Sequence, residues 1–409
     1  MQSILPQSLQ PDSVALAHSA ALRQLIDQTI EQAGGWINFA QFMQLALYAP
    51  GLGYYSAGAV KLGREGDFVT APELTPLFAQ TLANHVGSVL RELFQEARAG
   101  AASPLGQNPS VVSPDAPVLL ELGAGTGRLA LDLLLALQRQ DALPQQYLIL
   151  ELSPDLRARQ QATLAQLPPH VLQRVQWCEH WPEQIIGVVL ANEVLDAMPV
   201  HRLRWDQGRW EELGVAHHPH TKQWVQAARP LHHARLTQAL PQVRDWCGTY
   251  DTEVNLAAQE VMATLARSLL KGQALFIDYG FPAREFYHPQ RNTGTLMCHY
   301  RHHAHTDPFC YPGLQDITAH VDFTALARVA SAHGLAVLDY QTQAAWLIQN
   351  GITALLAAKD PEAVHHYLPA VAAVQQLLSP AEMGELFKVL VLGRGPAAGP
   401  ALQLLGLQE

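Results

Sequence analysis

The N-terminal part of the chain is dominated by apolar residues at helical spacing. Residues 19–48 place leucine and phenylalanine at the intervals of a helix, and residues 74–98 predict a second helix. Between these stretches, "APGLGYYSAG" (49–58) interrupts the pattern with proline and glycine. We therefore expect a helical N-terminal region over 1–104, which caps the rest of the protein and contains a loop over 53–78.

From residue 118 onward, short apolar runs alternate with helical patterns. The runs that predict buried strands are "VLLEL" (118–122), "YLILEL" (147–152), "VQWCE" (175–179), "GVVLANE" (187–193) and "ALFIDYG" (274–280). Helices are predicted at 128–140, from "SPDL" at 153, and at 252–270, 322–334, 342–358 and 361–378. "FKVLVLGRG" (387–395) is positioned to close the sheet. The alternation predicts an α/β fold, a Rossmann-like parallel sheet with helices on both faces.

Residues 201–229 change to the period of two that antiparallel strands show, with turns at "DQG" and "HPHT". We interpret 201–250 as an inserted β-hairpin region of the main domain. The stretch 286–320 is rich in Tyr, His and Pro and looks like a loop. The predicted organisation is a linker at 105–117, a main domain over 118–394 with a substrate-side region at about 281–325, and a tail at 395–409.

Charge and cysteine content narrow the class of protein. The formal net charge is −10, which argues against a surface that binds nucleic acid. No segment approaches the roughly 20 apolar residues of a membrane span. The four cysteines form no C-x-x-C pair, and the N-terminus does not resemble a signal peptide. We expect a cytoplasmic protein with no membrane partner.

The stretch "LELGAGTGRLALDLL" (120–134) carries the strongest chemical signal. Gly123, Gly125 and Gly127 occupy every second position after a strand, where a glycine backbone turns tightly and approaches a ligand. A dinucleotide fingerprint, G-x-G-x-x-G, would need glycine where Arg128 stands. With Glu121 ahead of it, the pattern E-x-G-x-G-x-G instead resembles the first motif of class I S-adenosylmethionine-dependent methyltransferases.

A second acid, Glu151, closes the next predicted strand and is followed by Leu152. A carboxylate there can accept hydrogen bonds from two ribose hydroxyls, in S-adenosylmethionine and in NAD alike. Trp177 and Trp181 flank the end of the third strand, where an adenine ring often stacks in this fold class. The alternative for each tryptophan is ordinary packing, and the alternative for the glycines is a tight turn without a ligand.

Further motifs identify a family. "GYYSAGAVKLGREGDFVTAPELTPLF" (53–78), "ANEVLDAMPV" (191–200), "FIDYG" (276–280) and "QDITAHVDF" (315–323), with the glycine motif, occur in the order found in the MidA family. The chain resembles this family of class I methyltransferases, which includes a mitochondrial protein arginine methyltransferase that assists complex I assembly. The resemblance implies S-adenosyl-L-methionine as cofactor and an arginine in a protein as substrate.

The resemblance also implies that the loop 53–78 covers the cofactor, through Gly66, Asp67 and Thr70. The alternative is that Thr70 only caps a helix that contains Pro72 and Glu73. "ANEVLDAMPV" follows the fourth strand, at the strand end where α/β proteins bind ligands. We expect Asn192 to contact the cofactor, and Glu193 and Asp196, on one face of a helical turn, to bind a guanidinium as catalytic residues. The alternative is an acid-rich helix start.

Three residues complete the predicted site. Asp278 and Tyr279 end the fifth strand at the same rim and are candidates for substrate contact, unless they form only a strand-end turn. His320 is able to accept a proton near neutral pH, although a lone histidine is more often structural. A helix start is expected beside it, capped by Asp322 or Thr318. "YRHHAHTDPFCY" (300–311) lacks the spacing of structural zinc ligands, so we expect no metal.

The sequence thus favours an S-adenosylmethionine-dependent methyltransferase acting on a protein arginine, with a homodimer as a possible assembly. Three alternatives stay open. A small-molecule methyltransferase would keep the cofactor and ignore arginine-containing proteins. A nicotinamide-dependent oxidoreductase would bind NAD instead. An assembly or scaffolding factor would bind the cofactor without needing turnover.

Overall fold

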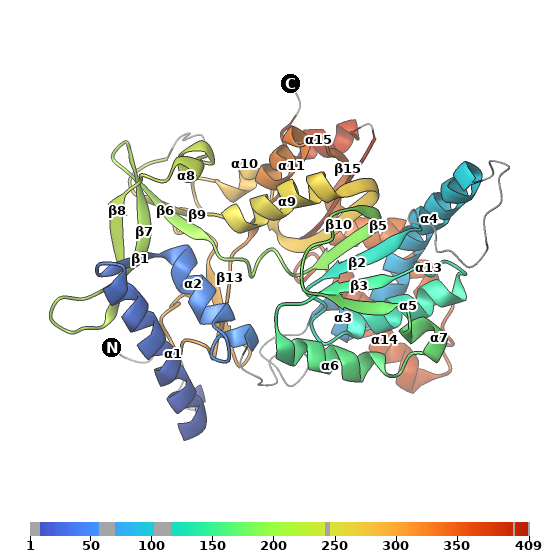
Figure 1. Cartoon of the computed structure of the whole chain (residues 1–409), viewed down its shortest axis with the longest axis horizontal. Coiled ribbons are helices and arrows are strands. Elements are labelled where there is room, and N and C mark those ends of the chain that lie inside the picture. The colour runs from blue at the N-terminus through green and yellow to red at the C-terminus, as the bar shows by residue number, and fades with distance from the viewer. Residues whose placement is uncertain (1–8, 57–69, 102–115, 242–245, 396, 408–409) are drawn as a thin grey trace. The chain divides into compact units, whose positions relative to one another are not determined.

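The computed structural model describes residues 9–56, 70–101, 116–241, 246–395 and 397–407 (Figure 1). Contacts between Cα atoms divide the chain into two compact units, each assembled from separate stretches. Unit 1 comprises Met1–Phe68, Leu195–Val261 and Phe281–Leu326. Unit 2 comprises Val69–Val194, Met262–Gly280 and Ala327–Glu409. Most of the predicted linker 105–117 lies outside the described residues, so the boundaries drawn from the sequence stay a prediction.

Unit 2 is built on one large sheet, with the strand order β15-β16-β10-β5-β2-β3-β4. Its strands are β2 (Val118–Leu122), β3 (Tyr147–Leu150), β4 (Val175–Cys178), β5 (Ile185–Asn192), β10 (Leu269–Phe281), β15 (Ala336–Thr342) and β16 (Phe387–Gly393). The run from β10 to β4 is parallel, which confirms the α/β class and the Rossmann-like core.

The expectation of a wholly parallel sheet is wrong at one edge. Strand β16 pairs antiparallel with β10, and β15 pairs antiparallel with β16. Every residue of β16 is buried, and its sequence is an apolar run apart from Lys388. Such a run indicates burial on both faces and carries no information about strand direction.

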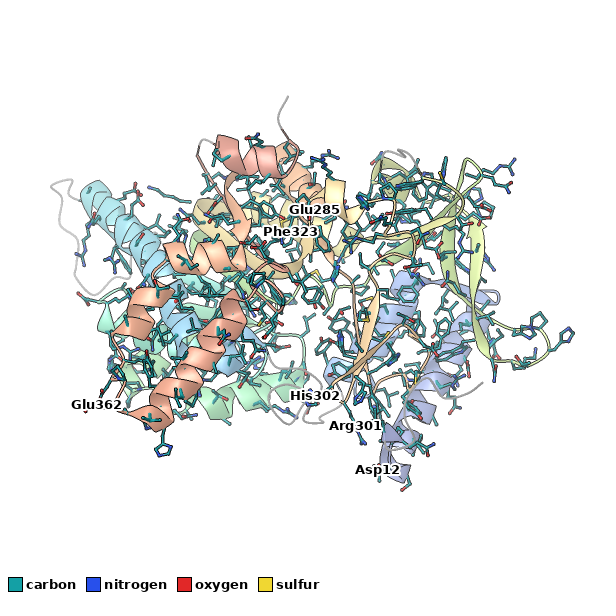
Figure 2. All side chains as sticks on the ribbon, turned by 180° about the vertical axis from the view of Figure 1, so that it is seen from behind. Asp12, Glu285, Arg301, His302, Phe323 and Glu362 are labelled. Atoms are coloured by element: carbon teal, nitrogen blue, oxygen red, sulfur yellow. The ribbon has the colours of Figure 1, made fainter. Side chains whose placement is uncertain are left out.

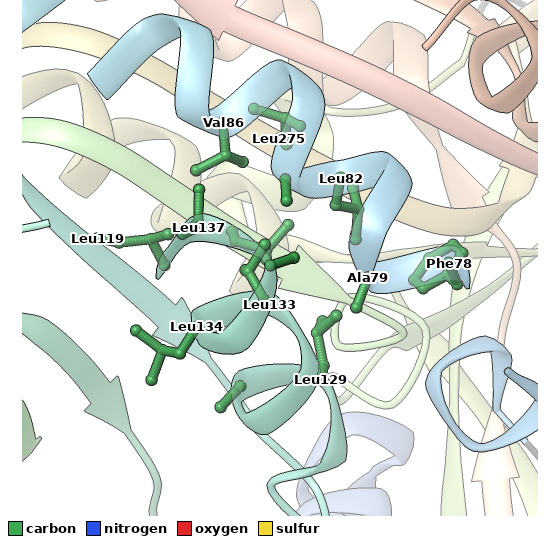
Figure 3. Packing of buried hydrophobic residues seen from close by; sticks show 14 of the residues in the cluster. Phe78, Ala79, Leu82, Val86, Leu119, Leu129, Leu133, Leu134, Leu137 and Leu275 are labelled. Carbon is green, nitrogen blue, oxygen red and sulfur yellow. The ribbon is translucent and has the colours of Figure 1, made fainter. Parts of the chain in front are cut away.

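Helices α4 (Pro76–Ala101) and α5 (Arg128–Arg139) pack together in the core of unit 2. Figure 3 shows Phe78, Leu82 and Val86 of α4 beside Leu129 and Leu133 of α5. These side chains are almost completely buried, and burial of one such leucine contributes about 1.5–3 kcal/mol. Because α5 follows the glycine loop directly, this packing fixes one end of that loop.

The other helices of unit 2 agree with the predicted ones in position, except for two at 169–172 and 399–404 that were not predicted. They are α3 (Ala71–Leu74), α6 (Pro154–Leu164), α7 (Pro169–Leu172), α12 (Gln343–Gln349), α13 (Ile352–Ala357), α14 (Val364–Leu378) and α15 (Gly399–Leu404). The Ser153 hydroxyl accepts from the Leu156 backbone N–H at 3.2 Å and caps α6 as predicted. One helix was expected over 342–358, but Gly351 has φ +93° and separates α12 from α13.

Unit 1 begins with the predicted helical region, which is interrupted. Helix α1 (Ser13–Gln32) and helix α2 (Phe39–Tyr48) are separated by strand β1 (Trp36–Asn38), where one helical stretch was expected. Gly34 and Gly35 have φ values of +77° and +87°, which end the helical geometry. A short 3-10 helix at Tyr54–Ser56 follows.

The stretch 201–229 forms the antiparallel strands that its alternation predicts, and residues 250–254, where a helix was expected from 252 onward, form a further strand. Strands β6 (His201–Asp206), β7 (Arg209–His217) and β8 (Trp224–Pro230) pair in sequence, and β9 (Tyr250–Val254) pairs with β6. Helix α8 (Ala234–Gln238) lies between β8 and β9, and helix α9 (Leu256–Ser268) follows β9. The helix expected over 252–270 ends at Ser268, and β10 begins at the next residue.

The stretch 286–320, expected to be a loop, contains a small antiparallel sheet of β11 (Met297–Tyr300), β12 (His303–His305) and β13 (Asp316–Thr318). Arg301 and His302 form the turn between β11 and β12, with φ +47° and +63° (Figure 2). Helix α10 (Ala283–Phe286) precedes this sheet, and β14 (Val321–Asp322) and helix α11 (Phe323–Ala332) follow it. Asp322 caps α11 through the Ala325 N–H at 3.0 Å, whereas Thr318 lies in β13.

The helices of the described segments include none whose length and apolarity would suit a bilayer crossing.

Candidate active site

The glycine loop joins β2 to α5 and has the backbone geometry that glycine permits. Gly123, Gly125 and Gly127 have φ values of +59°, +54° and +83°. Gly127 occupies the N-cap position of α5, and a Cβ atom added there would stand 3.1 Å from the Cα of Gln160. A side chain at this position is therefore disfavoured both by conformation and by space. The loop presents its backbone at the carboxyl end of β2, as predicted.

Glu121 lies at the base of this loop and is buried, with 2% of its surface exposed. The hydroxyl of Tyr147, from the neighbouring strand β3, donates a hydrogen bond to Glu121 Oε2 at 2.7 Å. Burial raises the pKa of Glu121 to about 7, against the opposing effect of the Tyr147 hydrogen bond. The negative charge of Glu151 raises this pKa further. The carboxyl is therefore poised to titrate near neutral pH.

Glu151 follows the end of β3 and is oriented by two donors. The backbone N–H of Ser153 donates to Oε1 at 2.9 Å, and the side-chain amide of Gln160 donates to Oε2 at 2.8 Å. Burial raises the pKa of Glu151, and these hydrogen bonds oppose the shift. The next residue, Leu152, is 78% exposed. An exposed apolar side chain beside an oriented carboxylate suits a ligand with an apolar ring and a polyhydroxyl group.

Gln160 was missed in the sequence analysis, although it connects several of the predicted site residues. Besides Glu151, its amide contacts the carbonyl of Gly125 and the indole N–H of Trp177. A signal for it exists in α6, where Leu156, Gln160 and Leu164 stand one helical turn apart. A polar residue within an apolar stripe is buried with its hydrogen bonds satisfied by specific partners.

Asn192 and Glu193 stand where β5 ends. Glu193 has φ +54°, an unusual conformation for a residue with a long side chain. Its Oε1 accepts hydrogen bonds from the Asn192 side-chain amide at 3.0 Å and from the Ala71 backbone N–H at 3.3 Å. The carboxylate is therefore anchored to the start of α3 and to its own neighbour.

The helical turn expected at Glu193 and Asp196 is absent, and so is the acid-rich helix start considered as its alternative. Residues 193–198 form bends and a turn. The backbone N–H of Glu193 donates to the carbonyl of Ile277 at 2.9 Å, which extends the β5–β10 pairing past the strand end. Spacing by three residues predicts a shared face only in a helix, and this segment continues from a strand.

Asp278, near the end of β10, is 1% exposed. Its two carboxylate oxygens accept backbone N–H groups, from Val194 at 3.2 Å and from Tyr279 at 2.9 Å. These contacts brace the segment that follows β5. The ring of Tyr279 packs edge-on against Phe387, with centroids 5.4 Å apart.

The part of the predicted covering loop that the structure describes begins at Thr70. Gly66 and Asp67 lie outside the described residues. Thr70 occupies the N-cap position of α3, but its side chain makes no capping hydrogen bond, so capping does not account for this threonine. Glu73, in the same helix, hydrogen-bonds the hydroxyl of Thr126 in the glycine loop. Helix α3 therefore contacts both the glycine loop and Glu193.

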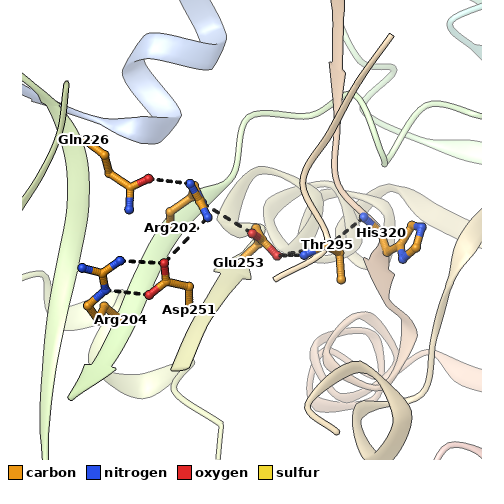
Figure 4. Close-up of polar contacts among 7 residues, drawn as sticks. All are labelled: Arg202, Arg204, Gln226, Asp251, Glu253, Thr295 and His320. Carbon is orange, nitrogen blue, oxygen red and sulfur yellow. Dashed lines mark hydrogen bonds and ion pairs between the residues drawn. The ribbon is translucent and has the colours of Figure 1, made fainter. Parts of the chain in front are cut away.

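Asp196 and His320 belong to unit 1. The carbonyl of Asp196 accepts from the Ala319 N–H at 3.0 Å. Figure 4 shows that the His320 backbone N–H donates to the Thr295 hydroxyl, at 3.1 Å, and that Thr295 in turn donates to Glu253. The His320 ring packs edge-on against Phe281. His320 is thus linked through Thr295 to a buried ion pair between Arg202 and Glu253.

The two tryptophans near the end of β4 have separate partners. The Trp177 indole N–H donates to Gln160 Oε1 at 2.9 Å, whereas the Trp181 indole N–H donates to the Ser268 hydroxyl at 2.8 Å. Only Trp177 therefore shares a hydrogen-bond network with Glu151. Among the described residues, no group of three or more His, Cys, Asp or Glu side chains is placed to hold a metal ion.

Comparison with known proteins identifies the class. A sequence model for a family of S-adenosyl-L-methionine-dependent methyltransferases matches residues 106–341, more than half of the chain. A crystal structure from Burkholderia thailandensis, bound to S-adenosyl-homocysteine, shares 46% sequence identity over 96% of each chain, with a TM-score of 0.86. The protein is therefore an S-adenosylmethionine-dependent methyltransferase. Within this class, the chain belongs to the MidA family.

Curated relatives extend the comparison. The chain is 28% identical to "Protein arginine methyltransferase NDUFAF7 homolog, mitochondrial" of Drosophila melanogaster, over 96% of this chain and 90% of the relative. It is also 28% identical to the Danio rerio protein arginine methyltransferase NDUFAF7, over 91% of this chain and 86% of the relative. Both relatives are named as mitochondrial, which contradicts the cytoplasmic location expected from the sequence. The reasoning behind that expectation, from cysteine content and the N-terminus, was insufficient because neither feature identifies a compartment uniquely.

Proposed function

We propose that this methyltransferase modifies a guanidinium nitrogen of arginine in a protein substrate. The observation that carries this proposal is the similarity, over nearly the whole chain, to relatives named as protein arginine methyltransferases. The anchored Glu193 carboxylate supports it, because a carboxylate forms charge-assisted hydrogen bonds with a guanidinium.

The residues at the ends of β2 and β3 fit the cofactor. Glycine at positions 123, 125 and 127 permits the left-handed backbone of the loop, whose peptide groups are not shielded by side chains at these three positions. Glu151 offers a carboxylate held by two donors, and Leu152 offers an exposed apolar side chain. We assign cofactor binding to these residues and, as predicted from the sequence, to Gly66, Asp67, Thr70, Glu121, Trp177 and Asn192.

When bound, S-adenosylmethionine supplies a methyl group on a sulfonium, and the transfer is a direct displacement that depends on alignment. The role we propose for Glu193 is to orient the guanidinium by accepting its N–H groups. Because Asn192 and Ala71 already hold Oε1, this carboxylate needs little reorganisation when substrate binds. We retain Asp196 and His320 as proposed catalytic residues and Asp278 and Tyr279 as proposed substrate-side residues.

The proposal is tested with methyl-labelled S-adenosylmethionine and arginine-containing candidate proteins, with the modified residue located by mass spectrometry. Label on an arginine, and its loss when that arginine is replaced by lysine, is the expected result. Label only in small molecules would contradict the proposed substrate and leave the methyltransferase class intact. Cofactor binding without any transfer would instead favour an assembly factor.

A further inference from the structure

A buried amide in helix α6 connects the parts of the proposed cofactor site. Gln160 lies in helix α6 and is 0% exposed. The two leucines one turn away on either side, Leu156 and Leu164, mark this as the packing face of the helix. An amide in such a position costs free energy unless its donors and acceptor are all paired.

The amide makes three hydrogen bonds, each to a different element. Its Nε2 donates to the Gly125 carbonyl at 3.0 Å and to Glu151 Oε2 at 2.8 Å. Its Oε1 accepts from the Trp177 indole N–H at 2.9 Å. The orientation of the amide is determined, because the reversed orientation would place oxygen against two acceptors and N–H against a donor.

We propose that Gln160 is a positioning residue. It holds the Glu151 carboxylate, the glycine loop and Trp177 in the arrangement that binds the adenosine part of the cofactor. The proposal rests on the assignment of Glu151 to the ribose. Gln160 acts through these groups and is not itself proposed to touch the cofactor. A single side chain thereby hydrogen-bonds to residues near the carboxyl ends of the three paired strands β2, β3 and β4.

Neither an acid nor an apolar residue of similar length can replace this amide. Glutamate would bring a second carboxylate to the place from which Nε2 now donates to Glu151, and like charges at this separation repel. Methionine has similar length but no donor, so Glu151 and the Gly125 carbonyl would each lose a partner. The Gly127 backbone also lies close to the backbone of residue 160, since a Cβ built on Gly127 would stand 3.1 Å from the Gln160 Cα. Neither substitution alters this approach.

The test compares Gln160→Met and Gln160→Glu with Gln161→Met and Gln161→Glu, in which the same changes fall on the exposed neighbouring residue. Calorimetry measures the Kd for S-adenosylhomocysteine and for its 2′-deoxy analogue. We expect about tenfold weaker S-adenosylhomocysteine binding for Gln160→Met, the equivalent of one charge-assisted hydrogen bond, and a larger loss for Gln160→Glu. The Gln161 variants should bind as the wild type does.

The 2′-deoxy analogue distinguishes a lost alignment of Glu151 from a general loss of structure in the binding site. The wild type should discriminate against it, whereas Gln160→Met should show a smaller ratio between the two ligands because Glu151 is no longer aligned. The KM for the methyl donor should rise in Gln160→Met, while kcat at saturating donor stays within about twofold of wild type. Unchanged Kd values and an unchanged ratio in the folded Gln160→Met variant would overturn the proposal.

A Glu151→Gln variant distinguishes failure of this inference from failure of the assignment beneath it. Weaker binding in Glu151→Gln but not in Gln160→Met would refute the positioning role alone. Undiminished binding in Glu151→Gln would refute the ribose assignment and the inference with it. Neither result depends on the methylated substrate, because both are measured as ligand binding.

Discussion

Glu121 and Tyr147 come from neighbouring parallel strands, and their side chains meet inside unit 2. The sequence placed Glu121 ahead of the glycines but gave no reason to expect its phenolic partner. That partner and the burial around it determine when the carboxyl carries a charge. A raised pKa in the folded state means that the native protein holds the proton over a pH range in which the unfolded chain has released it.

This shift predicts how stability depends on pH. Below about pH 4.5 the carboxyl is protonated in both states, and as pH rises toward 7 only the unfolded chain gains stability by ionising. The free energy of unfolding should therefore fall over this window, by up to about 3 kcal/mol at about 1.4 kcal/mol per unit of pKa shift. In Glu121→Gln this part of the fall should disappear. Urea unfolding of the cofactor-free protein at pH 5 and pH 8 measures it.

The exposed Glu382 provides the control, because Glu382→Gln removes a carboxylate that folding does not bury. That variant should keep the pH dependence of the wild type. Identical pH dependence in Glu121→Gln and wild type would show that this carboxyl does not have the raised pKa.

Glu193 carries a prediction about turnover. The variant Glu193→Gln keeps an oxygen for the Ala71 and Asn192 donors, so the fold and the Kd for S-adenosylhomocysteine should change little. Loss of the charge should reduce kcat at least about tenfold, because the guanidinium loses its charge-assisted partner. Steady-state methyl transfer at saturating donor provides the measurement. A kcat equal to that of the wild type would remove Glu193 from the proposed catalytic residues.

At the scale of elements, the parallel part of the sheet depends on two facing glycines. Gly187 of β5 is paired with Gly272 of β10 and with Val118 of β2. A Cβ atom added to Gly187 would stand 1.8 Å from the Val118 carbonyl oxygen, and one added to Gly272 would stand 1.8 Å from the Gly187 carbonyl oxygen. Their φ values of +151° and +108° are rare for other residues. Three strands therefore meet more closely here than side chains allow.

Gly187→Ala should disrupt this junction. The colliding atom is backbone carbonyl, which cannot move away without breaking the strand pairing, so we expect a loss of more than about 4 kcal/mol or an insoluble protein. Gly399→Ala is the control, because a Cβ there meets no atom within 4 Å. Soluble yield and the midpoint of thermal unfolding compare the two variants. A Gly187→Ala protein as stable as the wild type would refute the close junction.

Hydrophobic periodicity predicts where helices and strands lie along the chain, but it does not predict how the strands pair. The positions of β2, β3, β5 and α6 followed from apolar runs and a capping serine, because these signals are local. The direction of β16 and the small sheet in 297–318 did not follow, since both depend on which strand lies alongside. The three-residue spacing of Glu193 and Asp196 predicts a helical turn. The backbone at Glu193 instead continues the pairing of β5 with β10, because its N–H donates to the Ile277 carbonyl.

At the scale of the whole molecule, the chain alternates between two compact units. Each unit is assembled from three stretches separated in sequence. A reading along the chain produces consecutive domains, because composition and periodicity carry no information about which distant segments pack together. The predicted active-site residues accordingly divide between unit 2, which holds Glu151 and Glu193, and unit 1, which holds Asp196 and His320.

The whole protein should methylate its substrate without a metal ion. Direct displacement of a methyl group from a sulfonium depends on the alignment of donor and acceptor and requires no Lewis acid. Dialysis against EDTA should therefore leave both the rate of methyl transfer and the unfolding midpoint unchanged. Loss of activity that added Zn²⁺ restores would contradict this prediction.

The sequence by itself determined the α/β class, the glycine loop, the acids at the ends of β2 and β3, and the family to which these motifs belong. Such features are local: a glycine pattern, an apolar run and a strand-end acid are each contained in a few consecutive residues. Only the tertiary structure decided that Tyr147 meets Glu121, that Gln160 joins Gly125, Glu151 and Trp177, and that β16 runs antiparallel. These features depend on contacts between segments that are distant in sequence. The hydrophobic pattern of a sequence indicates that a side chain is buried but does not identify the residue that it contacts.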